Sequence, residues 1–264
     1  MKIRDVIDYL HGIAPNHLQE SYDNSGLLVG NYSDDVKGIL VSLDVTEEVL
    51  EEAKEQGANL IISHHPIIFS GLKRLVDDNY VQRIVKKAIQ KDINLFAIHT
   101  NLDNVLNQGV NERIAQNLGL KNIDVLLPKA DATEAYRIGS GLIGQLDNTF
   151  DEMEFLKFLK EKMKVNTVKY TQLIGRTVKS IALCGGSGRF LLNEAINQGA
   201  DVFISSDFKY HEYFDADGKI LIADIGHYES EQFTINLLHE ILTNKFNTFA
   251  THYTKVITNP VNYL

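Results

Sequence analysis

Two adjacent histidines, His64 and His65, follow the short apolar run from Asn59 to Ser63 and directly precede Pro66. A parallel strand delivers the residues at its carboxyl end to the edge of the sheet, where ligands collect. Because neighbouring residues of an extended chain point in opposite directions, the two imidazoles are better placed to bind two cations than one. The pair therefore predicts metal chemistry at the end of a buried strand.

Two later segments place donors of the same kind after apolar runs. One is residues 98–103, which end in Asp103, and the other is residues 226–231, which contain His227 and Glu231. On a helix, His227 and Glu231 would share one face and could hold a single ion. With the Glu231 carboxylate as a bridge, the donors fit a dinuclear site with ions about 3.5 to 4 Å apart. The predicted metal ligands are His64, His65, Asp103, His227 and Glu231.

Each of these residues also has a structural explanation when it is taken alone. A histidine after a strand is often only hydrogen-bonded, Asp103 can cap the next helix, and Glu231 can favour the dipole at the start of its own helix. Their coincidence at successive strand ends favours metal binding. We therefore expect two divalent cations per chain, and imidazole and carboxylate ligands do not decide among Zn, Fe, Mn, Co and Ni.

Other residues are candidates for catalysis or substrate binding. His99 and His211 are predicted to transfer protons or to contact substrate. The segment from Cys184 to Arg189 links a strand to a helix, so its backbone amides could bind phosphate with Arg189 as the counter-charge, and a tight turn is the alternative. Cys184 itself is expected to be a buried small residue. The glycines of this segment are Gly185, Gly186 and Gly188.

The positions of these residues depend on an α/β chain. The spacing of Ile3, Val6, Ile7 and Leu10 predicts an amphipathic opening helix. Apolar strands follow, each separated from the next by a helical pattern, which implies a parallel sheet covered by helices on both faces. The predicted strands include residues 38–43, 59–63, 94–98 and 220–224.

The chain also repeats itself. Residues 36–63 align without a gap with residues 178–205, and Lys, Glu, Gln and Ser coincide as well as apolar residues. We therefore expect two related three-layer α/β units from an internal duplication, with mostly parallel sheets. The first domain is expected to comprise residues 1–128, completed by 220–264, and the second residues 129–219.

The repeat separates the fold from the chemistry. His64 and His65 align with Ser206 and Asp207 of the second copy, so the fold itself does not require imidazoles at this strand end.

Composition limits the kinds of site, partner and cellular location that the chain can have. The single cysteine excludes an intrachain disulfide and a cysteine-based zinc cluster, and the net charge of -9 argues against nucleic acid or anionic lipid as a partner over the whole surface. Without an apolar run of about 18 residues or a secretory signal, a cytoplasmic protein is expected.

Four motifs together resemble the NIF-three-like family, whose members are also named GTP cyclohydrolase I type 2 homologues. The resemblance covers nearly the whole chain, and it implies a two-domain α/β fold, a dinuclear metal site with the same five ligands, and a toroidal homohexamer. Some members carry a further domain, whereas this chain has only the short connection from Pro128 to Tyr136, as in a compact form. The motifs are Asp23-Asn24-Ser-Gly-Leu, Ser-His64-His65-Pro, His99-Thr-Asn-Leu-Asp103 and Gly-His227-Tyr-Glu-Ser-Glu231.

The resemblance implies a metal-dependent hydrolase acting on a small molecule such as a nucleotide. In the cyclohydrolase version, a metal-bridging hydroxide opens the imidazole ring of GTP, and the glycine-rich segment holds the phosphates. Fold and metal do not fix the substrate. The alternatives are a non-catalytic metal-binding scaffold or regulatory protein, and a dinuclear metal phosphoesterase that acts on nucleotides.

Overall fold

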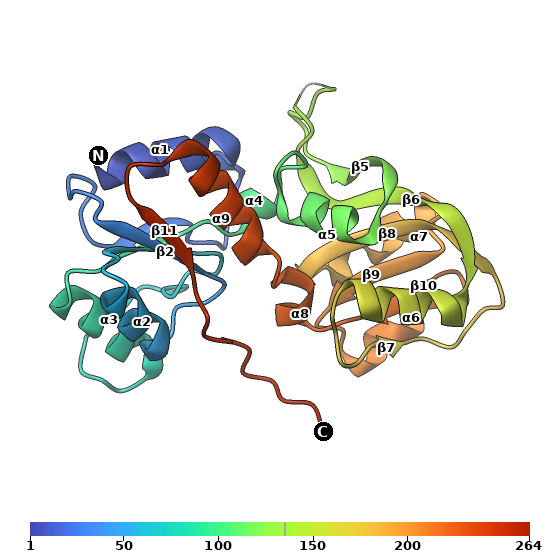
Figure 1. Ribbon diagram of the computed structural model, residues 1–264. Coiled ribbons are helices and arrows are strands. Elements are labelled where there is room, and N and C mark those ends of the chain that lie inside the picture. The colour runs from blue at the N-terminus through green and yellow to red at the C-terminus, as the bar shows by residue number, and fades with distance from the viewer. Residues whose placement is uncertain (135) are drawn as a thin grey trace. The chain divides into compact units, whose positions relative to one another are not determined.

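A computed structural model describes residues 1–134 and 136–264, and it divides into two compact units (Figure 1). Unit 1 comprises Met1–Leu102 and Thr234–Pro260. Unit 2 comprises Asp103–Phe233 and Val261–Leu264. The chain therefore passes between the units immediately before Asp103, immediately after Phe233 and again after Pro260.

Unit 1 is a five-stranded sheet covered by helices on both faces. The strand order is β1-β4-β3-β2-β11, in which only β1 runs antiparallel to its neighbour. Figure 1 shows α1 and α9 on one face of the sheet and α2 and α3 on the other. The elements are α1 (Ile3–Ile13), η1 (Asn16–Leu18), β1 (Gly26–Val29), β2 (Gly38–Ser42), α2 (Glu47–Glu55), β3 (Leu60–Ser63), α3 (Tyr80–Gln90), β4 (Asn94–Ala97), α9 (Thr234–Lys245) and β11 (Ala250–Tyr253), with α4 (Thr100–Asp103) at the crossing into unit 2.

The strands of unit 1 are apolar on both faces because both faces are covered. Leu40, Ile61 and Leu95 lie on the face that packs against α2 and α3, and the alternate residues of the same strands lie on the other face. The Thr46 side chain accepts a hydrogen bond from the Val49 amide, 3.2 Å away, and so begins α2 at the predicted cap.

Unit 2 contains a six-stranded sheet in the order β5-β6-β8-β9-β10-β7. On one face, Ala182 and Phe203 pack against α7, and on the other face α5 and α6 pack on β6 and β8. The elements are α5 (Val110–Leu118), β5 (Lys121–Pro128), β6 (Gly139–Asp151), α6 (Glu152–Lys162), β7 (Lys169–Tyr170), β8 (Thr177–Ser187), η2 (Arg189–Leu191), α7 (Leu192–Asn197), β9 (Val202–Ser206), η3 (Tyr210–Ala216), β10 (Leu221–Asp224) and α8 (His227–Glu231).

The strand register supports the predicted duplication. Ile39 pairs with Leu60 in the parallel ladder between β2 and β3, and the aligned residues Ile181 and Val202 pair in the ladder between β8 and β9. Each third parallel strand, β4 or β10, then pairs with an antiparallel edge strand, β1 or β7. The predicted α/β class and the relation between the two units are confirmed.

Two details differ from the sequence expectation. The sheet of unit 1 is mostly parallel as expected, whereas unit 2 has a mixed sheet in which only the β8–β9 and β9–β10 pairs are parallel. The connection from β5 to β6 is too short for a parallel crossover, so these strands pair antiparallel. This pairing, together with the packing of α5 on β6 and β8, places residues 103–128 in unit 2 and moves the boundary from 128 to 102/103. The second boundary lies at 233/234 instead of 220.

None of the helices in the described part of the chain has the length and apolar character that a membrane span needs.

The aligned residues Ile61 and Phe203 are both fully buried, so each is expected to stabilise its own unit. Replacing Phe203 by Ala should lower the free energy of unfolding by about 3–5 kcal/mol, and Ile61→Ala should lower it by about 2–5 kcal/mol. Phe190, which is 61% exposed, provides the control, and Phe190→Ala should stay within about 0.5 kcal/mol of the native protein. Urea unfolding measures all three. Equal stability of Phe203→Ala and Phe190→Ala would contradict this core.

Candidate metal centre

Three imidazoles gather at the carboxyl ends of the parallel strands of unit 1. His64 and His65 directly follow β3, and His99 lies two residues after β4. The ring centroids of His64 and His65 are 5.0 Å apart, and His99 lies 5.3 Å from the first ring and 5.4 Å from the second. Each ring offers a nitrogen within 4.8 Å of the others, which is close enough for shared metal binding.

In each of these imidazoles, Nδ1 is already engaged by a protein acceptor. The Nδ1 of His64 lies 2.9 Å from the carbonyl oxygen of Ile98, and the Nδ1 of His65 lies 2.7 Å from Oδ1 of Asp44. A carbonyl can only accept, so the proton of His64 lies on Nδ1 and the lone pair lies on Nε2. The same arrangement orients ligand histidines in metal sites, where the second ring nitrogen binds the cation.

His99 has a similar support from Asp23. Its Nδ1 lies 2.8 Å from Oδ1 of Asp23, while Oδ2 accepts hydrogen bonds from the Thr100 amide and hydroxyl at 3.0 and 2.5 Å. Burial raises the pKa of Asp23, but the hydrogen bonds from His99 and Thr100 outweigh it and hold that pKa well below its usual range. The carboxylate therefore stays ionised and keeps Nδ1 of His99 protonated.

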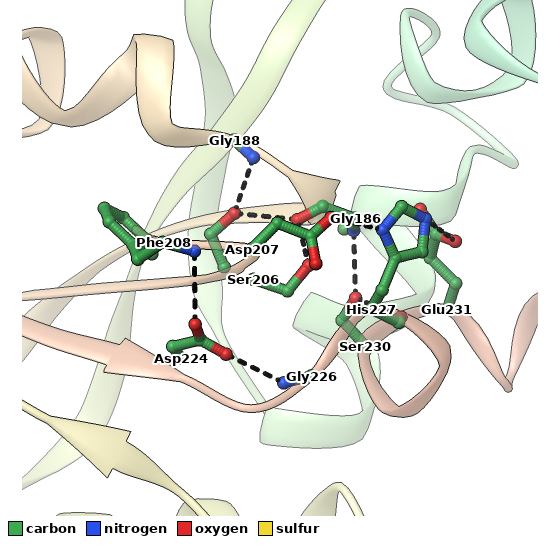
Figure 2. A network of polar contacts seen from close by, with 12 residues as sticks. Gly186, Gly188, Ser206, Asp207, Phe208, Asp224, Gly226, His227, Ser230 and Glu231 are labelled. Carbon is green, nitrogen blue, oxygen red and sulfur yellow. Dashed lines mark hydrogen bonds and ion pairs between the residues drawn. The ribbon is translucent and has the colours of Figure 1, made fainter. Parts of the chain in front are cut away.

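Unit 2 carries a second group of donors on the short helix α8. His227 and Glu231 lie four residues apart, with Nε2 of His227 3.2 Å from Oε2 of Glu231. Figure 2 shows His227 between this carboxylate and Asp207, whose Oδ2 lies 2.7 Å from Nδ1. Burial lowers the pKa of His227, but the two carboxylates outweigh it and raise that pKa to about 11. The proton on Nε2 of His227 thus lies between this nitrogen and the Glu231 carboxylate, where a cation could bind instead.

The Glu231 side chain packs directly against the backbone of Gly186, which has no side chain. Its side chain is 3% exposed, and a Cβ built on Gly186, where φ is +63°, would lie 2.3 Å from Oε1 of Glu231. The Gly186 amide donates a 2.9 Å hydrogen bond to the hydroxyl of Ser230, the residue before Glu231, and so fixes α8 against β8 (Figure 2). Only glycine admits the carboxylate here.

Asp103 belongs to the same side of unit 2. Asn111 donates to the Asp103 carbonyl oxygen at 3.1 Å and accepts from the Gly185 amide at 2.9 Å, which ties the end of α4 to β8. Burial and the charges of Asp103 and Glu231 raise the pKa of the Cys184 thiol. Both carboxylates therefore lie near this residue, and the thiol stays protonated, in agreement with the expected buried and unreactive role.

Asp224, a buried residue at the end of β10, fixes the segments that carry Asp207 and His227. Its Oδ2 accepts from the Phe208 amide at 3.2 Å, and its Oδ1 accepts from the Gly226 amide at 3.1 Å (Figure 2). The residues after β9 and β10 are therefore held by one carboxylate.

The glycine-rich segment from Cys184 to Arg189 forms several contacts within unit 2. The amides of Gly185, Gly186 and Gly188 donate to side-chain oxygens of Asn111, Ser230 and Ser205. Arg189 forms an ion pair with Asp215. These three amides and the Arg189 side chain therefore already have partners within unit 2.

The two histidines that were predicted to transfer protons belong to different units. His99 lies beside His64 and His65. His211 is exposed on η3, where its ring contacts Tyr210 and Phe214.

The sequence-predicted donors thus form one group in each unit: His64, His65 and His99 in unit 1, and Asp103, His227 and Glu231 in unit 2. Imidazole and carboxylate groups of this kind fit divalent transition-metal ions. Sequence reasoning missed the acceptors Asp44 and Asp207. The alignment of Asp207 with His65 was the available signal for the second of them, because it marks a polar residue at the same strand end.

The protein is thus a two-unit α/β protein whose units arose by duplication, and its histidine and carboxylate groups could hold metal ions. A model of the family described as Duf34/NIF3 (NGG1p interacting factor 3) matches residues 1–260. The chain belongs to this family, which confirms the resemblance in the motifs.

Proteins similar to this one cover most or all of the chain. A Clostridium perfringens protein named GTP cyclohydrolase 1 type 2 homolog is 36% identical over 234 residues, which cover 88% of this chain and 87% of that protein. A Campylobacter jejuni protein of the same name is 34% identical and covers 92% of this chain and 93% of its own length. The crystal structure of Staphylococcus aureus protein SA1388 has a TM-score of 0.92 and 34% identity, covering 100% of this chain and 99% of that one.

The ring of His227 is expected to stay protonated at neutral pH in the metal-free protein. Because the folded-state pKa of about 11 lies above the ordinary value of 6.5, the stability from this proton is fully present below pH 6.5 and is lost as the pH rises toward 11. NMR titration of labelled histidine after chelator treatment measures the midpoint. Asp207→Asn should move that midpoint downward, and a native midpoint near 6.5 would contradict the two-carboxylate environment.

Gly186→Ala is expected to displace Glu231. Gly199 provides a matched control, because its φ is +71° and a Cβ there would meet nothing within 4 Å. Both variants should lose about 1–2 kcal/mol from the left-handed backbone, but only Gly186→Ala should also retain less Zn²⁺ after dialysis. Thermal unfolding and elemental analysis measure the two effects. Equal zinc retention in both variants would show that Gly186 does not seat Glu231.

Proposed function

We propose that the protein is a dinuclear divalent-metal-dependent hydrolase whose cations are held by His64, His65, Asp103, His227 and Glu231. The observation that carries this proposal is the hydrogen bond at Nδ1 of every proposed histidine ligand, to a carbonyl or carboxylate oxygen. A histidine that binds a metal almost always donates its other ring N–H to such an acceptor, which fixes the ring for the cation. His99 shares the arrangement without being a proposed ligand.

Chain connectivity supports one shared centre. The chain enters unit 2 at Asp103 and leaves it at Phe233, two residues after Glu231. The two proposed carboxylate ligands therefore lie next to the crossing points, while the histidines of unit 1 follow the central strands β3 and β4. We propose that both groups of donors serve the same pair of cations.

Bound divalent cations would supply Lewis acidity and lower the pKa of a water molecule, and five protein ligands leave coordination positions for water and substrate. His99 is the better supported of the two proton-transfer candidates. The ionised Asp23 keeps its Nδ1 protonated, so its Nε2 can accept a proton and return it to a leaving group. For His211, the contacts described above are with the rings of Tyr210 and Phe214 and not with a carboxylate.

For the substrate, we propose a nucleotide, with hydrolytic ring opening of GTP at C8 as the first reaction to test. The support is the name of the relatives, GTP cyclohydrolase 1 type 2 homolog. Hydrolysis of a phosphoester is the alternative reaction for the same donors. A toroidal homohexamer and a cytoplasmic location remain predictions, and analytical ultracentrifugation tests the first.

His65→Ala is expected to lose at least one cation and most of the turnover, because it removes a ligand. His252→Ala, at an exposed histidine of β11, is the control and should match the native protein. The protein is purified without chelator, its metal is identified by elemental analysis, and that metal form is assayed for formate from GTP and orthophosphate from a phosphoester panel. Full metal content and turnover in His65→Ala would contradict the site. Bound metal without activity on any substrate would favour a scaffold.

A further inference from the structure

The chain continues after β11 as a segment without helix or strand, Thr254–Leu264, which Figure 1 shows running to the C-terminus. Its start is anchored on α2, where the Lys255 amide donates a 3.0 Å hydrogen bond to Glu52. Residues up to Pro260 belong to unit 1, and Val261–Leu264 belong to unit 2. The segment therefore contacts both units although it has no regular structure of its own.

In unit 1, this segment reaches the support of a proposed metal ligand. The Thr258 hydroxyl donates a 2.6 Å hydrogen bond to Oδ2 of Asp44, while Oδ1 of the same carboxylate holds Nδ1 of His65 at 2.7 Å. The two oxygens of Asp44 thus have separate partners. The Asp44 side chain is about one-third exposed, so water could otherwise replace its partners and let the carboxylate rotate. The hydrogen bond from the Thr258 hydroxyl limits that rotation.

In unit 2, the same segment reaches the helix that carries the other histidine ligand. The Tyr263 hydroxyl hydrogen-bonds the Glu229 carboxylate, and Glu229 lies between His227 and Glu231 on α8. A Cβ on Gly226, the residue before α8, would lie 2.9 Å from the Tyr263 hydroxyl oxygen and 2.3 Å from Oε2 of Glu229. Tyr263 and the Glu229 carboxylate therefore pack together against Gly226, directly before α8.

We propose that the C-terminal segment is a strap that orients the metal ligands, with Thr258 as a positioning residue for His65 and Tyr263 as a positioning residue for α8. The proposal rests on the proposed metal function. Thr258 and Tyr263 are separated by only four residues, and each contacts a carboxylate next to a proposed ligand. Neither residue contacts the reacting atoms in this proposal, so the strap acts on metal affinity through the ligands.

The test compares Thr258→Val and Tyr263→Phe in the full chain. Each removes a single hydroxyl, and each should raise the dissociation constant for Zn²⁺ about threefold to tenfold, because partners of ligand-supporting groups contribute to metal affinity. Thr243→Val and Tyr170→Phe are the controls. The Thr243 hydroxyl bonds its own helix, and Tyr170 is 46% exposed compared with 43% for Tyr263.

Zn²⁺ affinity is measured by competition with a chelating indicator, and melting of the metal-free variants is measured beside it. The expected result is weaker Zn²⁺ binding with melting temperatures equal to those of the controls. Native affinity in both strap variants would overturn the strap while leaving the metal site intact, provided that His65→Ala loses metal. Affinity that falls only in step with the melting temperature would show a merely structural role. Native zinc binding by His65→Ala would overturn the proposed function and the strap together.

Discussion

The hydrogen bond at Nδ1 of each proposed histidine ligand is the interaction on which the proposed metal centre depends. For His64 the acceptor is a carbonyl just after β4, for His65 a carboxylate just after β2, and for His227 a carboxylate just after β9. All three acceptors come from strand ends beside the ligand segment. Parallel pairing therefore sets the tautomer of the imidazoles, because it fixes which acceptors stand next to them.

The duplication shows how one scaffold was given two chemical roles. His65 aligns with Asp207, so the same strand end supplies a proposed ligand in unit 1 and the acceptor for a proposed ligand in unit 2. Asp44 aligns with Gly186, which has no side chain and thereby leaves room for Glu231. The two ladders share their register over three residue pairs before these positions, and the β8–β9 ladder becomes irregular between Leu183 and Ser187.

The sequence was sufficient for the α/β class, the duplication and the donors at the strand ends, because all three follow from local pattern and alignment. It was not sufficient for the mixed sheet of unit 2, since strand direction depends on pairings between distant segments. The acceptor Asp44 resembles any acidic loop residue until β2 and β3 are paired. Gly186 was visible as a glycine, but its purpose became apparent only with Glu231 packed against it.

Charge balance connects these features to the choice of substrate. Asp103 and Glu231 would neutralise half of the charge of two divalent cations, and the supporting carboxylates Asp44 and Asp207 would offset the rest. An anionic substrate is then not required to complete the balance. The glycine-rich amides are also committed to protein oxygens. In either proposed reaction, contacts to a phosphate would therefore come from groups other than these three amides.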